Sequence, residues 1–410
     1  MIHLYVSLII LSVFLYLNIK RKELFCVSTF LISLYVLSLA CGILYNQLYD
    51  EKLINNDVYI GPIYFVLFTW ILYLYPFYAY NEYKRTSLKL PGIRVLNLVS
   101  DISIVLSLLT FIVFIPNVGN AFSVESIAMA RSDLSQGRES SGSGLLYTIS
   151  AVISFFFILP LFLSFIYAII GKSRLRMILL FISSFSYPLY VFNCLGRDGV
   201  IFWIFSFFAC FLFLKDYLPQ KANKRLRRVG FCFIALLLIP FFIISQSRFG
   251  EEISMYLLDY TGQSFSNAAY YLGTKMQPFN IGEGWPLFTR LLGMGDVEPQ
   301  FWEVAGTNST GFGSLVVSFC VSLGNWGTWI LGFISLFIFL VLLGKGKRVD
   351  FPCVFVYFMY FQVLSQGLFY FRHANVGGNF YIIMSFVLYF VFKWIFRLQI
   401  TSPIIIEKQC

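Results

Sequence analysis

The longest interruption in an otherwise apolar chain is residues 246–312, QSRFGEEISMYLLDYTGQSFSNAAYYLGTKMQPFNIGEGWPLFTRLLGMGDVEPQFWEVAGTNSTGF. It mixes charged residues with tyrosine, tryptophan and glycine, whereas a solvated linker is rich in serine, lysine and glutamate and poor in rings. The stretch is therefore predicted to be a large folded cap, and the part of the chain where chemistry takes place.

On either side of this stretch the chain has the composition of a polytopic membrane protein. Of its 410 residues 59% are hydrophobic, 20% are aromatic and only 12% are charged, which lies outside the range of soluble domains. The formal net charge of +10 does not indicate a nucleic-acid partner, because the basic residues fall in short clusters between apolar runs. These clusters are topology signals.

A transmembrane helix needs about 20 apolar residues. The runs of suitable length predict an all-α protein with about eleven spans, at 2–18, 24–45, 59–80, 95–116, 145–170, 177–193, 200–214, 229–245, 325–343, 353–371 and 380–396. Residues 1–245 then hold eight spans, 246–312 form the cap, and 313–410 hold three spans and a tail. The first run has its basic residues after it, so it is predicted to be a retained helix and not a signal peptide.

Basic residues set the orientation of these spans. When alternate loops are assigned to one side, 22 of the 30 lysines and arginines fall on that side and eight on the other. The positive-inside rule makes the richer side cytoplasmic. The amino terminus is then predicted to be periplasmic, the carboxyl terminus cytoplasmic, and the cap outward-facing on a bacterial inner membrane.

The sequence positions of four outward arginines indicate a functional site. Arg197 lies in the short turn Leu195-Gly-Arg-Asp-Gly199, Arg248 follows a span closely, Arg372 occupies the last outward turn, and Arg290 lies within the cap. Charges at the membrane boundary are costly and usually functional. The alternatives are that Arg197 pairs with Asp198 or reaches lipid headgroups, and that Arg290 holds the cap together.

A group of arginines at one outer rim suits a lipid-linked pyrophosphate, because guanidinium groups bind phosphate oxygens bidentately. If a sugar is transferred from that carrier, arginines also stabilise the charge that develops on the leaving phosphate. His373, Glu251 and Glu252 are candidates for the base that deprotonates the acceptor hydroxyl, although His373 has a passive interfacial role as its alternative. Tyr256, Tyr260 and Trp285 are candidates for stacking on sugar rings.

Neither a metal nor another cofactor is predicted. The one Asp-x-Glu spacing, Asp296-Val-Glu298, has no histidine beside it and is a weak indication of a divalent ion. Most of the eight cysteines lie in or beside apolar runs, where a small buried side chain is the ordinary role.

In architecture the chain resembles the Wzy-type polymerases of O-antigen and capsule repeat units. The resemblance is carried by Gly196-Arg-Asp-Gly199, Gln246-Ser-Arg248, and Thr307-Asn-Ser-Thr-Gly-Phe-Gly313 followed by Leu323-Gly-Asn-Trp-Gly-Thr328. It implies a GT-C-like fold and a metal-independent membrane glycosyltransferase that joins polyprenyl-pyrophosphate-linked oligosaccharides at the outer face of the membrane. It also implies that Ser314–Leu323 is a short helix dipping in from outside, and that a chain-length regulator and membrane lipids are partners.

Two other functions fit the same pattern. An O-antigen ligase uses the same chemistry and fold. A flippase for lipid-linked oligosaccharide also gathers arginines for pyrophosphate, but it should line a central cavity with charges from the spans, where Asp101 is the one acidic residue clearly inside a span.

Overall fold

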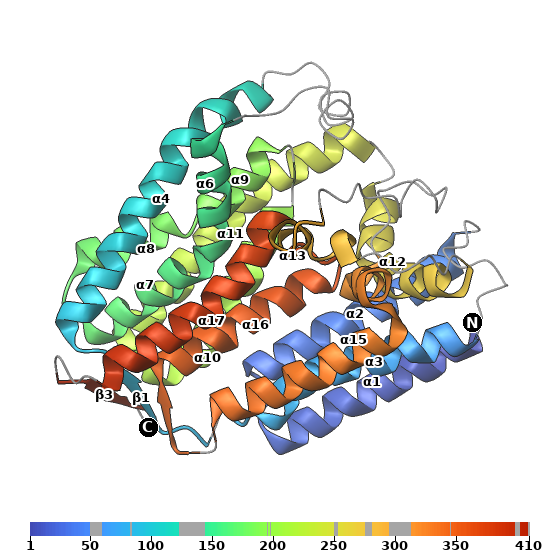
Figure 1. The fold of residues 1–410 in the computed structure, drawn as a ribbon, viewed down its shortest axis with the longest axis horizontal. Coiled ribbons are helices and arrows are strands. Elements are labelled where there is room, and N and C mark those ends of the chain that lie inside the picture. The colour runs from blue at the N-terminus through green and yellow to red at the C-terminus, as the bar shows by residue number, and fades with distance from the viewer. Residues whose placement is uncertain are drawn as a thin grey trace. The chain divides into compact units, whose positions relative to one another are not determined.

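The computed structural model is built mainly from α-helices (Figure 1). It describes residues 1–49, 60–82, 84–122, 144–194, 196, 198–249, 253–274, 281–294, 313–344, 346–397 and 402–408. The helices are α1 (Ile2–Arg21), α2 (Val27–Leu48), α3 (Ile60–Ala79), α4 (Ile93–Phe122), α6 (Leu145–Ser154), α7 (Ile158–Ile170), α8 (Arg174–Ser183), α9 (Ser186–Asn193), α10 (Asp198–Leu214), α11 (Gln220–Phe249), α12 (Ile253–Thr274), α13 (Pro286–Leu291), α15 (Ser314–Leu343), α16 (Phe351–Gly367) and α17 (Val376–Arg397).

Within the described residues, nine helical stretches are long and apolar enough to cross a membrane, and each overlaps a predicted span; Ser314–Leu343 also includes the segment predicted as a separate short helix. The chain is therefore an all-α, multi-pass membrane protein. Three of the nine are composite: α6 and α7 together cover Leu145–Ile170, α8 and α9 cover Arg174–Asn193, and α10 with the short 3₁₀ helix η2 (Lys215–Tyr217) covers Asp198–Tyr217. The other two predicted spans are helical as α11 and α16 but are not among the nine, so the total of eleven stays a prediction.

The chain packs as two compact units. Unit 1 consists of Met1–Lys84, Ser254–Lys345 and Tyr360–Ile382. Unit 2 consists of Arg85–Ile253, Gly346–Met359 and Ile383–Cys410. Each unit thus gathers segments that are far apart in the sequence.

In unit 1, α1, α2, α3 and α15 pack against one another (Figure 1, blue and orange). α15 lies close to α3 because Gly332 has no side chain; a Cβ there would lie 2.6 Å from Leu72 Cδ2. Beside this contact the rings of Phe65 and Trp329 stack with centroids 5.3 Å apart, and Trp329 Nε1 donates to Thr69 Oγ1 at 2.9 Å. A small residue at the contact and a hydrogen bond across it are typical of helix association in membranes.

α15 consists of two helical halves joined at Gly324, whose φ of 70° and ψ of 173° lie outside the helical region. Glycine adopts such angles without the cost that a Cβ imposes. The half Ser314–Leu323 is largely buried, whereas the second half exposes large apolar side chains such as Phe333 and Phe337, as a lipid-facing helix does. Ser314–Leu323 is thus helical, and its role as a short helix that dips in from the outer side stays a prediction.

The described part of the predicted cap is folded. It contains α12, the short 3₁₀ helix η4 (Ile281–Glu283) and α13. α12 crosses α2 at two glycines, because a Cβ on Gly42 would lie 2.5 Å from Gly262 O, and Ser38 Oγ donates to Thr261 O at 2.6 Å beside the crossing. α12 therefore packs against α2 backbone to backbone, while a cap over the membrane stays a prediction.

Unit 2 contains a three-stranded sheet that the sequence did not predict. Its order is β2 (Arg348–Asp350), β1 (Ser87–Leu90), β3 (Ile404–Glu407), with β1 parallel to β2 and antiparallel to β3. Lys408 Nζ lies 3.1 Å from Asp216 Oδ2 next to the sheet. All these segments are assigned to the cytoplasmic side by the basic-residue count, and their pairing requires that they lie on one side.

Candidate functional site

Six of the predicted site residues belong to unit 1: Tyr256, Tyr260, Trp285, Arg290, Arg372 and His373. Arg197, Glu251 and Glu252 lie outside the described residues, as does the side chain of Arg248, whose backbone belongs to α11 in unit 2. The convergence of the four arginines therefore stays a prediction. The site can be built from the residues that share unit 1.

Arg372 lies in the tight turn that joins α16 to α17. Two backbone bonds shape the turn, from Arg372 N to Tyr370 O at 2.8 Å and from Ala374 N to Phe371 O at 2.9 Å. The half-exposed guanidinium has its central carbon 5.6 Å from the centre of the Tyr370 ring, which is within the range of a cation–π contact. The ring supports the cation at one edge of the turn.

His373, the next residue, has its side chain in the interior of unit 1. It is 0% exposed, and its ring stacks on Tyr381 with centroids 5.3 Å apart and an interplanar angle of 23°. Tyr381 is in turn fixed by its hydroxyl, which donates to Gln362 Oε1 at 2.9 Å. Burial, and to a smaller degree the charge of Arg372, lower the pKa of His373 to about 3, so the imidazole is neutral at physiological pH.

Trp285 and Arg290 lie at opposite ends of α13. Trp285 precedes the helix, and its ring packs against Phe319 at 6.0 Å and Phe371 at 5.3 Å between centroids. Its buried indole nitrogen has no hydrogen-bond partner among the described residues. Arg290 is exposed in the last turn of α13, where a cation is favoured by the helix dipole.

A single buried side chain, Asn379 in the first turn of α17, joins α13 to the arginine turn. Its Nδ2 donates to His373 O at 2.7 Å and to Gly284 O at 3.1 Å, and its Oδ1 accepts from Leu287 N at 3.2 Å. We call this arrangement the Asn379 junction. It brings together the two segments that carry Arg290 and Arg372, which lie far apart in the sequence.

The two predicted sugar-stacking tyrosines lie on α12. Tyr256 and Tyr260 are four residues apart and half-buried, so they occupy one face of the helix. Their proposed contact with sugar rings stays a prediction.

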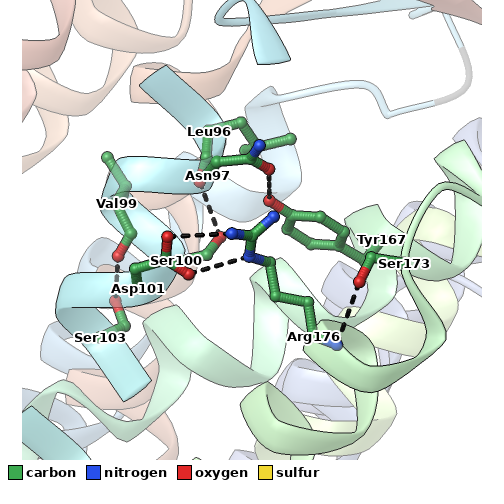
Figure 2. A network of polar contacts seen from close by, with 9 residues as sticks. All are labelled: Leu96, Asn97, Val99, Ser100, Asp101, Ser103, Tyr167, Ser173 and Arg176. Atoms are coloured by element: carbon green, nitrogen blue, oxygen red, sulfur yellow. Dashed lines mark hydrogen bonds and ion pairs between the residues drawn. The ribbon is translucent and has the colours of Figure 1, made fainter. Parts of the chain in front are cut away.

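Asp101, the acidic residue inside a predicted span, is part of a polar network in unit 2 (Figure 2). Arg176, in the first turn of α8, donates from Nε to Asp101 Oδ1 at 2.9 Å and from Nη2 to Asp101 Oδ2 at 3.0 Å. Nearby, the Tyr167 hydroxyl donates to Asn97 Oδ1 at 2.6 Å, and the Ser173 hydroxyl caps α8 by accepting from Arg176 N at 3.3 Å. The bidentate pair joins α4 to α8 and gives Asp101 a structural role.

Sequence reasoning missed Asn379 and the aromatic residues Phe319 and Phe371, which hold the site together. One signal was available, since Asn379 follows two glycines, and a glycine pair at a helix start indicates close backbone approach. A Cβ at Gly378 would overlap the backbone of His373, lying 2.8 Å from its carbonyl oxygen. Phe319 and Phe371 gave no such signal in a chain with 48 phenylalanines.

Within the part of the chain that the structure describes, no three His, Cys, Asp or Glu side chains are grouped so that they could hold a metal ion. A scan of protein-family models and searches of curated proteins and of solved structures found no match to the chain.

Proposed function

We propose that the protein polymerises polyprenyl-pyrophosphate-linked oligosaccharide repeat units at the outer face of a bacterial inner membrane. It would be a metal-independent glycosyltransferase of the kind that the sequence resembles. The alternatives are a ligase of the same chemistry and a flippase.

The observation that carries the proposal is the Asn379 junction. Through it, the segment with Arg290 and the turn with Arg372 meet in unit 1, although 81 residues separate the two arginines in the sequence. Two cationic segments held together by a buried side chain are suited to an anionic ligand, because a shared anion offsets their mutual repulsion. The basic-residue count assigns both segments to the outer side, at the depth of a lipid-linked pyrophosphate.

In the proposed reaction, an acceptor hydroxyl oxygen forms a bond to the anomeric carbon of the donor sugar. The bond between that carbon and the pyrophosphate oxygen breaks, and the polyprenyl pyrophosphate leaves with the electron pair. The hydroxyl proton passes to a base. Arg290 and Arg372 bind the pyrophosphate and stabilise the negative charge that grows on it, which lowers the barrier to its departure.

The residues proposed as the base are His373, Glu251 and Glu252. The buried imidazole of His373 is neutral, as a base must be, but a pKa of about 3 makes it a weak proton acceptor. This favours Glu251 and Glu252 as the first residues to test.

The setting of Asp101 argues against the flippase. A flippase should line a central cavity with charges from its spans, yet both carboxylate oxygens of Asp101 accept from Arg176, and the Asp101 side chain is 52% exposed within the described structure. A charge pair on the surface of unit 2 serves packing between α4 and α8.

Deletion of the gene tests the proposal. We expect the surface glycan of the deletion strain, analysed on a gel, to consist of single repeat units with no long polymer, and plasmid-borne wild type to restore the ladder. Loss of a ligase would instead leave long polymer on its carrier, and loss of a flippase would strand single units on the cytoplasmic face. Undiminished surface polymer in the deletion strain would overturn the polymerase assignment.

A further inference from the structure

We propose that Asn379 is a positioning residue, which sets the spacing between the α13 segment with Arg290 and the turn with Arg372. The effect of Asn379 on catalysis rests on the proposed function, because the spacing affects the polymerisation rate only if both arginines bind one pyrophosphate. The spacing itself is a property of the fold and is measurable without any substrate.

One amide group makes the hydrogen bonds of this connection, beside the packing of the Trp285 ring on Phe371. Asn379 is 0% exposed, and its two donor bonds end on carbonyls of two segments, His373 O in the arginine turn and Gly284 O ahead of α13. Its oxygen accepts from Leu287 N, an amide in the first turn of α13 that no residue of the same helix can satisfy. The residue before α13, Trp285, offers no side-chain cap, so Asn379 caps that helix from α17.

Only an asparagine fits this combination of partners. Two carbonyl oxygens require two donors, and an amide nitrogen requires an acceptor, which together match a carboxamide of this length. An aspartate of the same shape would lose both donors and bring a negative charge towards two carbonyl oxygens. Alanine would leave all three backbone groups without their buried partner.

Two glycines allow close packing around the Asn379 amide. A Cβ at Gly378 would overlap the His373 backbone, and a Cβ at Gly284 would overlap the Ser322 hydroxyl in the first half of α15. The arginine turn is therefore closely packed on the start of α17, the α13 segment is closely packed on α15, and the hydrogen bonds of Asn379 connect the two segments. A shift of about 1 Å in a group that binds the reacting centre can cost on the order of a hundredfold in rate.

The test compares Asn379→Ala with Asn18→Ala. Asn18 is also 0% exposed in unit 1, and its Nδ2 donates to Ser28 Oγ and Thr29 Oγ1 at 3.2 and 2.9 Å, so its replacement removes a similar number of buried bonds outside the site. Two readouts are measured on the purified full-length protein. One is the polymerisation rate at saturating lipid-linked repeat unit. The other is the distance between spin labels on Leu291→Cys and Ala374→Cys, in a background without native cysteines that still makes polymer.

We expect Asn379→Ala to slow polymerisation at least tenfold and to broaden or shift the label distance, and Asn18→Ala to change neither. Asn379→Asp keeps the side-chain shape and replaces the alanine variant if that variant does not fold. An unchanged distance in the Asn379 variants would overturn the proposal, as would normal polymerisation despite a changed distance. If the wild type itself makes no polymer, the proposed function fails while the distance still tests the spacing.

Discussion

Arg176 in unit 2 and Arg372 in unit 1 are both arginines beside the ends of apolar helices, and their surroundings differ. Arg176 meets Asp101 through two parallel bonds of 2.9 and 3.0 Å, in a network whose members are serine, asparagine and tyrosine (Figure 2). Arg372 lies over the Tyr370 ring in a turn that Asn379 joins to a second arginine-bearing segment. One arginine neutralises a carboxylate, and the other lies in a turn whose backbone Asn379 connects to the segment that carries Arg290.

An arginine at the membrane boundary is therefore not in itself a sign of function. A carboxylate 75 residues away in the sequence can make it a structural group, as Asp101 does for Arg176. The segments that meet around an arginine are a better guide than its depth. The predictions that follow test this distinction.

The largest effect is expected from Arg372→Lys. Lysine keeps the charge but removes the bidentate fork, so each lost phosphate contact of about 1.4 kcal/mol or more should slow polymerisation tenfold or more. Arg176→Lys is the matched control and should leave the polymer ladder unchanged. The readout is the rate of polymer formation at equal protein level. Equal loss in the two variants would contradict the distinction between the two arginines.

Gly378→Ala should destabilise the junction. The added Cβ overlaps the His373 backbone, so the turn or α17 must move, at a cost of roughly 1–3 kcal/mol. Gly61→Ala is the control, because nothing lies within 4 Å of a Cβ at Gly61 in α3. Thermal unfolding in detergent measures both variants. A Gly378→Ala protein as stable as Gly61→Ala would mean that the backbones do not meet as described.

Acid should weaken unit 1 through His373. The pKa is about 3 in the folded protein, against an ordinary value of 6.5, so between these values the unfolded chain binds more protons than the folded one. The contribution of His373 to the free energy of unfolding is present above pH 6.5. It falls as the pH drops, by about 1 kcal/mol between pH 6.5 and pH 5.5. The difference in unfolding midpoint between wild type and His373→Gln isolates this contribution. A pH-independent difference would show that the ring is not buried.

The smallest effect is expected from Asp101→Asn. Asparagine keeps the shape of the Asp101 side chain and still offers Arg176 one acceptor oxygen, so the link between α4 and α8 is weakened and not lost. We expect a small drop in the unfolding midpoint and normal polymer. Loss of polymer in Asp101→Asn at normal protein level would point to transport chemistry at this carboxylate and would favour the flippase.

Much of the fold was predictable because the length of an apolar run is a strong indication of a membrane-spanning helix. The nine helices long and apolar enough to cross a membrane follow from runs of apolar residues of that length. The break at Gly324 falls where the short helix Ser314–Leu323 was predicted to end. The sheet of β1, β2 and β3 was not predictable, because strands of three or four residues show no usable period. Ile404–Glu407 acquires its structure by pairing with Ser87–Leu90.

The charges of the candidate site are visible in the sequence, whereas its geometry is not. Arg372 was selected for its place in the last outward turn and Arg290 for its place in the cap, and their role stays a prediction. The burial of His373 was not predictable, because it depends on Tyr381 and on the glycine contact at 378, which are set by tertiary packing. The same holds for Asn379, whose partners lie 6, 92 and 95 residues away.

Binding of inorganic pyrophosphate to the purified protein tests the central claim most directly. We expect saturable binding by the wild type at low salt, about tenfold weaker binding by Arg372→Lys and by Arg290→Lys, and unchanged binding by Arg176→Lys. Absence of saturable binding by the wild type, or equal binding by all three variants, would contradict a pyrophosphate site at the Asn379 junction.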